Sequence, residues 1–408
     1  MTDPASLADR VQEGELRIHE LEAEADFDTA AEARRLLVER KTDADLEAIG
    51  DYAFPAERAE PNIENMIGAA QVPMGVVGPV SVSGGAVEGE RYLPLATTEG
   101  ALLASVNRGL SVIGSAGGAD ARVTKNGMTR APVFRVDGVA EAAETVEWVE
   151  DNLEALREAA ESTTSHGELL GVEPYVVGDS VYLRFAYDTK DAMGMNMATI
   201  ATEAACEVVA EETPASLVAL SGNLCSDKKP AAINAVEGRG RSVTADVVIP
   251  GDLVEDRLHT TAEAIVEANT RKNLVGSAKA GSLGFNAHAA NVVGAAFLAT
   301  GQDEAQVVEG ANAITTMDAR NAEDGATDLY ASVSLASLEV GTVGGGTKLP
   351  TQSEALDVLG LRGGGDPAGS NADALAEIIA VGALAGELSL LAALASNHLA
   401  SAHEDLGR

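Results

Sequence analysis

The residues best suited to chemistry lie in one short polar run, residues 221–234, which reads Ser-Gly-Asn-Leu-Cys-Ser-Asp-Lys-Lys-Pro-Ala-Ala-Ile-Asn. Lys228 and Lys229 follow directly on Asp227 there. Two adjacent ammonium groups repel each other unless an anion lies between them or in front of them. The pair therefore suits a bound carboxylate or a developing oxyanion. Alternatively, the run is a solvated loop at a helix start, with Pro230 at the first helical position.

Other candidate side chains lie at the ends of predicted helices. Thr97 or Thr98 is a good N-cap, which places Glu99 in the first helical turn, where an acid complements the helix dipole. Asp303 opens another helix, and Lys272 terminates the helix predicted at 252–270. Each of these charged residues has either a capping role or a chemical one.

A small unit of alternating strands and helices is predicted within residues 132–219. The pattern indicates strands at 132–136, 168–177, 180–187 and 215–220 and helices at 139–162 and 193–212, with a hairpin turn at Gly178 and Asp179. This βαββαβ order is typical of a ferredoxin-like unit inserted between two parts of a larger domain.

The remaining segments are assigned to the larger part of the chain. Polar helices are predicted at 4–23 and 28–48, a tightly turned loop at 64–80, a strand at 91–95, a strand at 243–249, and helices at 252–270, 285–301 and 371–398. The last helix is apolar nearly all round, so we expect it to be buried. His288 and Asn291 lie on one face of the helix before it.

Two glycine-containing segments are candidate ligand sites. Residues 188–197 run from a strand end into a helix start, where free N–H groups and Gly194 suit a phosphate. Residues 341–347 contain three consecutive glycines, which suit either a close approach to a ligand or a turn. No G-x-G-x-x-G follows a strand, which argues against an ordinary Rossmann domain.

Composition limits the classes of function. The net charge is -36, from 64 acidic against 28 basic residues, and this excludes nucleic acid as a general partner. The acids are spread along the chain and aromatic residues make up only 3%, which indicates a surface adapted to high salt. No uncharged apolar run reaches the roughly 18 residues of a membrane span. With only Cys206 and Cys225 and a polar N-terminus, we predict a soluble cytoplasmic protein.

Several motifs together resemble one family, hydroxymethylglutaryl-CoA reductase, from about residue 60 to the C-terminus. The motifs occur in the family order: Glu64-Asn-Met-Ile-Gly, Thr97-Thr-Glu-Gly, Asp191-Ala-Met-Gly-Met-Asn, Ser226-Asp-Lys-Lys-Pro-Ala-Ala-Ile-Asn, Lys272-Asn-Leu-Val-Gly-Ser, Asn286-Ala-His-Ala-Ala-Asn, Gly301-Gln-Asp, Gly341-Thr-Val-Gly-Gly-Gly-Thr and Ala385-Gly-Glu-Leu-Ser-Leu. The resemblance is to the class of eukaryotes and archaea, without the sterol-sensing membrane anchor.

The resemblance implies an α+β fold. A helical segment at residues 1–60 would precede a large mixed α/β domain at 61–131 and 220–408, which binds the CoA substrate and dimerises. The ferredoxin-like unit at 132–219 would bind NADPH. The active site would lie between subunits of a homodimer or homotetramer, with no metal, nucleic acid or membrane as partner.

The implied reaction is the NADPH-dependent reduction of 3-hydroxy-3-methylglutaryl-CoA to mevalonate and CoA in the mevalonate pathway. Two NADPH are used, through a hemithioacetal and then mevaldehyde. By resemblance, Lys228 stabilises the oxyanion and His403 protonates the departing CoA thiolate. Glu99 delivers a proton to the aldehyde oxygen, and Asp303 bridges Lys228 and Glu99.

The resemblance also assigns binding residues. The carboxylate of the substrate would meet Arg130, Ser221, Asp227, Lys229, Lys272 and Asn291. Residues near CoA would be Ser105, Asn107, Arg108 and His288. The cofactor would lie along Asp191, Met193, Gly194, Met195 and Asn196, with Gly344 and Gly345 close to it.

The chain departs from the family pattern in places. Ser165-His-Gly replaces the Ser-Arg-Phe that contacts the 2'-phosphate of NADPH, Ala69 replaces an aromatic residue, and His259 replaces a lysine near CoA. No serine follows His403, so we expect the family's kinase switch to be absent. Two other functions remain open. One is a different acyl-CoA or aldehyde oxidoreductase on the same scaffold, including one that runs oxidatively with NAD, and the other is a non-catalytic acidic assembly protein.

Overall fold

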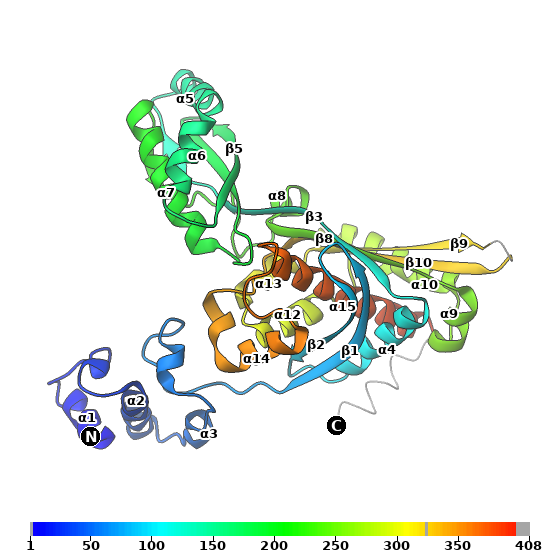
Figure 1. Ribbon diagram of the computed structural model, residues 1–408, viewed down its shortest axis with the longest axis horizontal. Coiled ribbons are helices and arrows are strands. Elements are labelled where there is room, and N and C mark those ends of the chain that lie inside the picture. The colour runs from blue at the N-terminus through cyan, green and yellow to red at the C-terminus, as the bar shows by residue number, and fades with distance from the viewer. Residues whose placement is uncertain (1–2, 323–324, 397–408) are drawn as a thin grey trace.

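The computed structural model describes residues 3–322 and 325–396 of the 408-residue chain. Its first 60 residues form small helices at one side of the main body (Figure 1), which Arg58 contacts by donating to the Lys348 carbonyl at 3.4 Å. These are α1 (Pro4–Gln12), η1 (Leu21–Ala23), α2 (Phe27–Thr42), α3 (Glu47–Gly50) and η2 (Ala56–Ala59). The helices predicted at 4–23 and 28–48 are both shorter than expected. Gly14 at φ 82 follows the end of α1, and Asp43 at φ 54 ends α2.

The main sheet is built from six strands. They are β1 (Met74–Gly84), β2 (Glu88–Ala96), β3 (Ala119–Arg130), β8 (Gly240–Ile249), β9 (Ala313–Asn321) and β10 (Thr327–Leu338). The strands pair in the order β2-β1-β3-β8-β10-β9, and every pair is antiparallel except β1 with β3. The predicted strands at 91–95 and 243–249 are the inner parts of β2 and β8.

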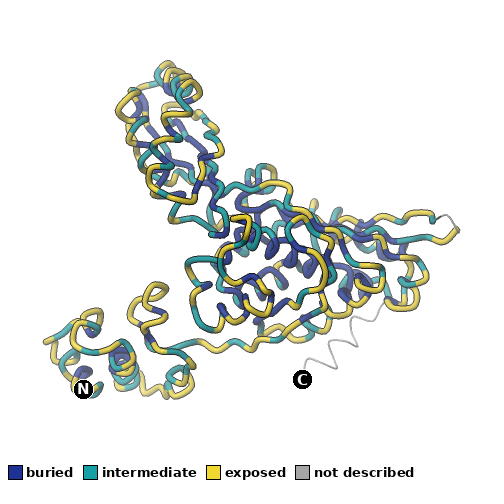
Figure 2. The backbone as a smooth tube through the Cα atoms, in the orientation of Figure 1, coloured by how far each residue is buried: buried dark blue, intermediate teal, exposed yellow. Residues whose placement is uncertain are grey.

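One long helix, α15 (Ser370–Ala395), lies against this sheet and forms the centre of the core. It contacts the strands β1, β3, β8 and β10 and the helices α4 (Leu102–Ser115) and α12 (Ala289–Thr300). Its burial confirms the expectation from its apolar sequence (Figure 2). This helix is long and apolar enough to cross a membrane, although Glu377 and Glu387 interrupt it, and 83% of its most apolar 18-residue stretch is buried inside the protein.

The region predicted as one helix at 252–270 consists of two helices, α9 (Gly251–Leu258) and α10 (Ala262–Asn269). His259 separates them because its backbone is left-handed, at φ 55. From Asn269 the chain continues through a π-helical turn, η3 (Thr270–Gly276), into α11 (Ser277–Ala280). Lys272 therefore lies inside a continuous helical segment, and the prediction that it ends a helix is wrong.

The smaller unit contains β4 (Val133–Arg135), α5 (Val139–Asp151), α6 (Leu153–Glu161), β5 (Glu168–Val177), β6 (Ser180–Asp188), α7 (Met195–Glu212) and β7 (Ser216–Ala219). Its strands pair antiparallel in the order β7-β4-β6-β5. Counted along the chain, this is fourth, first, third and second, the strand order of a ferredoxin-like unit. The predicted topology is confirmed, although the helix at 139–162 is interrupted at Asn152, whose side-chain amide donates to the Trp148 carbonyl at 2.8 Å.

The two sheets are joined because β3 is long enough to take part in both. Its last residues, from Met128 to Arg130, pair with β6 from Tyr187 to Phe185. The smaller unit stands on one side of the main body, and each has its own hydrophobic core (Figures 1 and 2). The short elements α8 (Ala232–Val236), η4 (Glu304–Gln306), α13 (Val307–Gly310), η5 (Gly345–Lys348) and α14 (Pro350–Leu359) belong to the main body. The whole is an α+β fold, as predicted.

Candidate active site

The paired lysines lie on a loop between β7 and α8. The Lys228 ammonium nitrogen is 2.8 Å from Oδ2 of Asp303. The hydrogen bond to this carboxylate raises the pKa of Lys228, so the side chain stays charged. Asp303 is fixed in turn as the N-cap of η4, since it accepts the Ala305 N–H at 3.2 Å.

The loop that carries Lys228 has an unusual backbone. Asn223, Ser226 and Lys228 all adopt left-handed φ angles, at 63°, 49° and 57°. This region is unfavourable for residues with a Cβ, so bonds from the surroundings must hold it. The Lys228 N–H donates to Oε1 of Glu309 at 2.8 Å, and the Asn234 side chain donates to the Ser226 carbonyl at 2.9 Å. Helix α8 begins at Ala232, so Pro230 is not at the first helical position as predicted.

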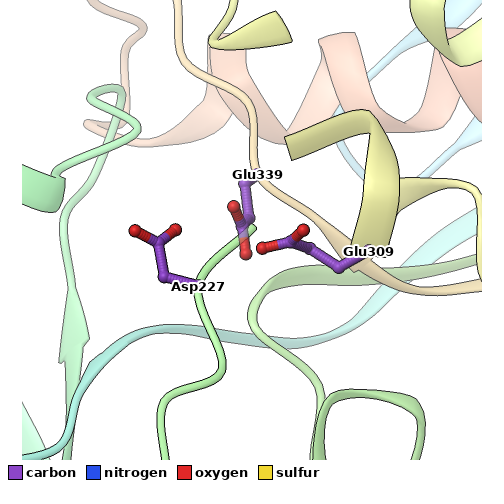
Figure 3. Close-up of side chains that lie close together, drawn as sticks. All are labelled: Asp227, Glu309 and Glu339. Carbon is purple, nitrogen blue, oxygen red and sulfur yellow. The ribbon is translucent and has the colours of Figure 1, made fainter. Parts of the chain in front are cut away.

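Behind the loop lies a buried guanidinium surrounded by three carboxylates. Nη1 of Arg239 is 3.0 Å from Oδ1 of Asp227 and 3.3 Å from Oε1 of Glu309, and it also bonds Oε1 of Glu339. The carboxylates come from three separate segments and converge on one point (Figure 3). Burial raises the pKa of Glu309 and raises that of Glu339 well above its usual range.

The two glycine-containing segments predicted to bind a ligand lie side by side. The N–H of Thr342 donates to the Asp191 carbonyl at 2.8 Å, and Ala192 forms a β-bridge with Val343. Gly344 and Gly345 have positive φ angles and open space where a Cβ would stand. This arrangement leaves room for a ligand beside residues 341–347, here called the glycine loop.

Helix α7 begins at this place with an open end. It starts at Met195, two residues later than predicted, with Gly194 as N-cap at φ 87 and no side chain bonded to its first N–H groups. An uncapped helix N-terminus favours a negative ligand such as a phosphate. Asn196 in the first turn is exposed. Sδ of Met195 lies 2.8 Å from Nη2 of Arg239, so the helix start adjoins the Lys228 loop.

The Asp191 side chain, just before α7, has a structural role. Its carboxylate accepts the N–H groups of Gly365, Gly369 and Ala372 at 2.9, 2.7 and 3.1 Å. These amides precede and open α15, so Asp191 ties the start of the core helix to the glycine loop. These bonds occupy its carboxylate with backbone N–H groups.

Three residues predicted near CoA meet around one turn of α15. Oγ of Ser105 is 2.9 Å from Oγ of Ser389, and Arg108 donates to the same oxygen at 3.0 Å. Nε2 of His288 is 2.8 Å from the Gly386 carbonyl. Burial lowers the pKa of Arg108. Asn107 lies elsewhere, where its side chain accepts the Gly78 N–H at 2.9 Å.

A family model for hydroxymethylglutaryl-coenzyme A reductase matches residues 30–408, which include every element of this site. The chain belongs to the hydroxymethylglutaryl-coenzyme A reductase family. It is 78% identical over 408 residues to the 3-hydroxy-3-methylglutaryl-coenzyme A reductase of Haloferax volcanii, with 100% of both chains covered. It is 74% identical over 407 residues to the reductase of Halobacterium salinarum, covering 100% of this chain and 99% of the relative. These haloarchaeal relatives agree with the high-salt interpretation of the acidic surface.

A solved reductase structure shows the same fold. The class II 3-hydroxy-3-methylglutaryl-CoA reductase from Streptococcus pneumoniae, bound to NADPH in open conformations, matches with a TM-score of 0.66. The match covers 93% of this chain and 96% of that one at 22% identity. At this identity the likeness supports the α+β architecture.

Not all residues expected from the reductase family come together in the described part of the chain. Helix α4 begins at Leu102 with Ala101 at φ 67 as N-cap, so Glu99 precedes the helix and is not in its first turn. Across residues 3–322 and 325–396, the exposed Glu99 carboxylate makes no bond to Lys228 or Asp303. His403 lies outside the described residues. The described residues therefore bring together Lys228 and Asp303 of the expected catalytic group.

The residues expected to bind the substrate carboxylate are similarly divided. Nζ of Lys229 donates to the Asp227 carbonyl at 2.9 Å, and Oγ of Ser221 lies 3.9 Å from the Cys225 sulfur. Arg130 ends β3 with a buried Nε that has no hydrogen-bond partner in the part of the chain that the structure describes. Among the described residues, the Lys272 and Asn291 side chains make no hydrogen bond to this loop.

The sequence reading missed the buried groups behind Lys228. Arg239, Gln306, Glu309 and Glu339 each have 0% exposure. Charged residues that interrupt apolar runs could have indicated these buried groups. Glu339 follows an apolar strand, and Glu309 follows Val307 and Val308. That signal marks burial, but it does not identify the partners.

Proposed function

We propose that the chain reduces 3-hydroxy-3-methylglutaryl-CoA to mevalonate and free CoA, with two NADPH and two protons consumed per turnover. The observation that carries this proposal is the Lys228–Asp303 ion pair of 2.8 Å, on the family's lysine loop and next to the glycine segments. The names of the 78% and 74% identical relatives support the substrate and the reaction.

The residues present fit NADPH. The uncapped start of α7 offers N–H groups to a phosphate, and the open space at Gly344 and Gly345 lets a ligand approach the backbone. Met193, Gly194, Met195 and Asn196 would line this place, beside Arg239 and the lysine loop. When bound, NADPH supplies a hydride to the thioester carbonyl carbon and a second hydride to the aldehyde carbon.

In the first reduction the Lys228 ammonium stabilises the negative charge that develops on the thioester oxygen. Asp303 keeps this ammonium charged and fixed in direction. Cleavage of the C–S bond then releases the CoA thiolate, which takes a proton from His403. Ser105, Arg108 and His288 hold the CoA portion near α15.

In the second reduction the aldehyde oxygen takes a proton from Glu99, with Lys228 again nearby. The free carboxylate of the substrate meets Arg130, Ser221, Asp227, Lys229, Lys272 and Asn291. Cations and hydroxyl donors predominate in this set, which suits a carboxylate. Asp227 fits through its role in orienting the lysines, because its own carboxylate is bonded to Arg239.

We further propose that the complete site forms between two copies of the chain. Glu99 is exposed and makes no bond to Lys228 among the described residues, which supports a site in which a second copy supplies either Glu99 or the lysine loop. The separate hydrophobic cores support a substrate domain at 61–131 and 220–408 and a cofactor domain at 132–219. The two free, buried cysteines support a reducing location such as the cytoplasm.

The test is the stoichiometry of the reaction in molar salt. The purified chain is mixed with hydroxymethylglutaryl-CoA and NADPH, and oxidised cofactor and released CoA thiol are measured together. Two NADPH oxidised per CoA support the four-electron reduction. One NADPH per CoA, or turnover only with NADH, would instead support a different acyl-CoA or aldehyde oxidoreductase.

A further inference from the structure

The short helical segment from Asp303 to Glu309 is bonded at three points to the loop that carries Lys228. Asp303 binds the Lys228 ammonium, Gln306 donates to the Asp227 carboxylate at 3.4 Å, and Glu309 accepts the Lys228 N–H at 2.8 Å. These three residues are spaced three apart. In a 3₁₀ or α-helical turn that spacing places side chains on one face. The segment therefore fixes both the side chain and the backbone of Lys228.

The bond between Glu309 and the Lys228 backbone depends on a buried charge cluster, which consists of Asp227, Arg239, Glu309 and Glu339. Glu309 is fully buried, and Arg239 holds it together with Glu339 and Asp227. Lys228 sits at φ 57, a conformation that costs about 1 kcal/mol or more for a residue with a Cβ. The Glu309 bond to its N–H opposes relaxation of that backbone, which would swing the ammonium away from Asp303.

The cluster has more negative than positive groups. Asp227, Glu309 and Glu339 carry three carboxylates against the single guanidinium of Arg239. Oε2 of Glu309 and Oε2 of Glu339 are buried without a hydrogen-bond partner in the described chain. An unpaired buried negative charge is costly, and one ligand oxygen from each of the three carboxylates lies within 4.8 Å of the others, so a proton on one carboxyl group removes a charge from a crowded cluster. The place where a cation could bind the three carboxylates is taken by Nη1 of Arg239.

We propose that Glu309 is a positioning residue for Lys228, and that Glu309 and Glu339 share one proton, which stabilises the buried charge cluster. The proposal rests on the catalytic role of Lys228 argued above. The other titratable groups that face the pair are Asp227, Lys228 and Cys225 from the loop, and Arg239 from the turn before β8. Neutralising one carboxyl leaves Arg239 able to bond the remaining ones.

The kinetic test compares Glu309→Gln with Glu309→Leu in molar salt. The glutamine retains an oxygen for the Lys228 N–H, whereas leucine of similar size removes it. We expect E309L to lower kcat about 10- to 100-fold with little change in the KM for NADPH, as a displaced catalytic group would. E309Q should restore kcat to within about threefold of the wild type. A folded E309L chain with wild-type kcat would overturn the positioning role.

Glu377→Leu is the matched control. Glu377 is also a buried carboxylate that accepts backbone N–H groups, from Gly85, Ala86 and Val87, but it lies on α15 away from Lys228. Its loss should lower the melting temperature and leave the kcat of the folded protein unchanged. Equal losses of kcat in E309L and E377L would show a general effect of instability and would contradict the proposal.

The proton is tested without catalysis, so its outcome is independent of the proposed reaction. Infrared difference spectra between the wild type and Glu339→Gln at neutral pH should show loss of a protonated carboxyl band, and Glu309→Gln should remove the same band. An unchanged band in both variants overturns the shared proton, even if E309L fails to fold. If the wild type itself shows no turnover with hydroxymethylglutaryl-CoA while the band is present, the proposed function fails and the proton assignment stands.

Discussion

Lys228 and Asp303 meet across 2.8 Å although one lies on an irregular loop and the other caps a short helix far along the chain. Neither partner is buried, since their side chains are 43% and 30% exposed. An ion pair this exposed adds little to stability, with typical values of about 0–1 kcal/mol. Its value is directional, because the pair sets where the ammonium points in the site.

Replacing Asp303 should therefore impair catalysis much more than folding. For Asp303→Asn we expect kcat for the thioester to fall about 100-fold, because the ammonium loses its fixed direction. The melting temperature should change by only a few degrees, since exposed pairs contribute about 1 kcal/mol at most. Steady-state kinetics and thermal melts in molar salt measure both. A loss of stability large enough to explain the loss of activity contradicts this view of the pair.

The buried Glu339 predicts a specific dependence of stability on pH. Burial raises its pKa well above 4.5, its value in an unfolded chain. Between these two values the folded state binds a proton that the unfolded state has released, so the free energy of unfolding falls as pH rises through this window. Glu339→Gln has no such proton. The stability difference, variant minus wild type, should therefore increase with pH above about 4.5.

Denaturant titrations at several pH values, all in molar salt, measure that difference. Glu354→Gln on the surface of α14 serves as a control, since its exposed carboxyl has no buried partner. A flat difference across the pH range, or one that decreases, means that Glu339 is ionised in the folded protein.

Asp191 should matter for stability more than for chemistry. Asp191 is 5% exposed, and its carboxylate accepts hydrogen bonds from three N–H groups near the start of α15. Asp191→Ala removes the charged acceptor and leaves the three N–H donors buried. We therefore expect the free energy of unfolding to fall by about 2–4 kcal/mol. Asp191→Asn keeps one oxygen acceptor and should cost less. Chemical denaturation measures both variants, and equal stability of Asp191→Ala and the wild type refutes the assignment.

The net charge of -36 predicts a strong effect of salt on folding. In dilute buffer the acidic groups repel one another over about 30 Å at 0.01 M ionic strength, against about 3 Å at 1 M. The melting temperature should therefore rise steeply with KCl concentration. Sucrose, which adds no ions, is the control for general exclusion effects. Identical melting in dilute buffer and in molar salt contradicts the high-salt interpretation.

His403 is expected to act only where a thiolate leaves. His403→Gln should slow reduction of hydroxymethylglutaryl-CoA by about 100- to 10,000-fold, the usual contribution of a general acid. Reduction of added mevaldehyde, which releases no thiol, should be nearly unchanged. Parallel assays with the two substrates check this. Equal losses in both remove the proposed role of His403 in thiolate protonation.

Local patterns were enough to predict much of the fold. The hairpin turning at Gly178 and Asp179, the ferredoxin-like order and the buried last helix all follow from periodicity and turn residues. Some of the errors arose where single residues take left-handed backbone conformations. Ala101 delays the start of α4 past Glu99, and His259 divides a helix. Alanine rarely takes such a conformation, and histidine, although enriched there, does so at only a small share of its positions.

The site was predictable where chemistry is concentrated in short motifs, and unpredictable where it depends on long-range contacts. Lys228 and Asp303 were linked by family resemblance, and the structure brings them together. Arg239, Glu309 and Glu339 lie far apart in the sequence, and only the fold makes them neighbours. A charged residue in an apolar run indicates a buried partner, but tertiary structure decides which one.

The central claim is that the Lys228 ammonium stabilises the oxyanion formed on the thioester. The most direct measurement is kcat for hydroxymethylglutaryl-CoA with Lys228→Met in molar salt, on protein shown by circular dichroism to be folded. We predict a fall of about 100- to 1,000-fold or more, the loss seen when an oxyanion donor is removed. A variant that retains kcat within tenfold of the wild type would contradict the account.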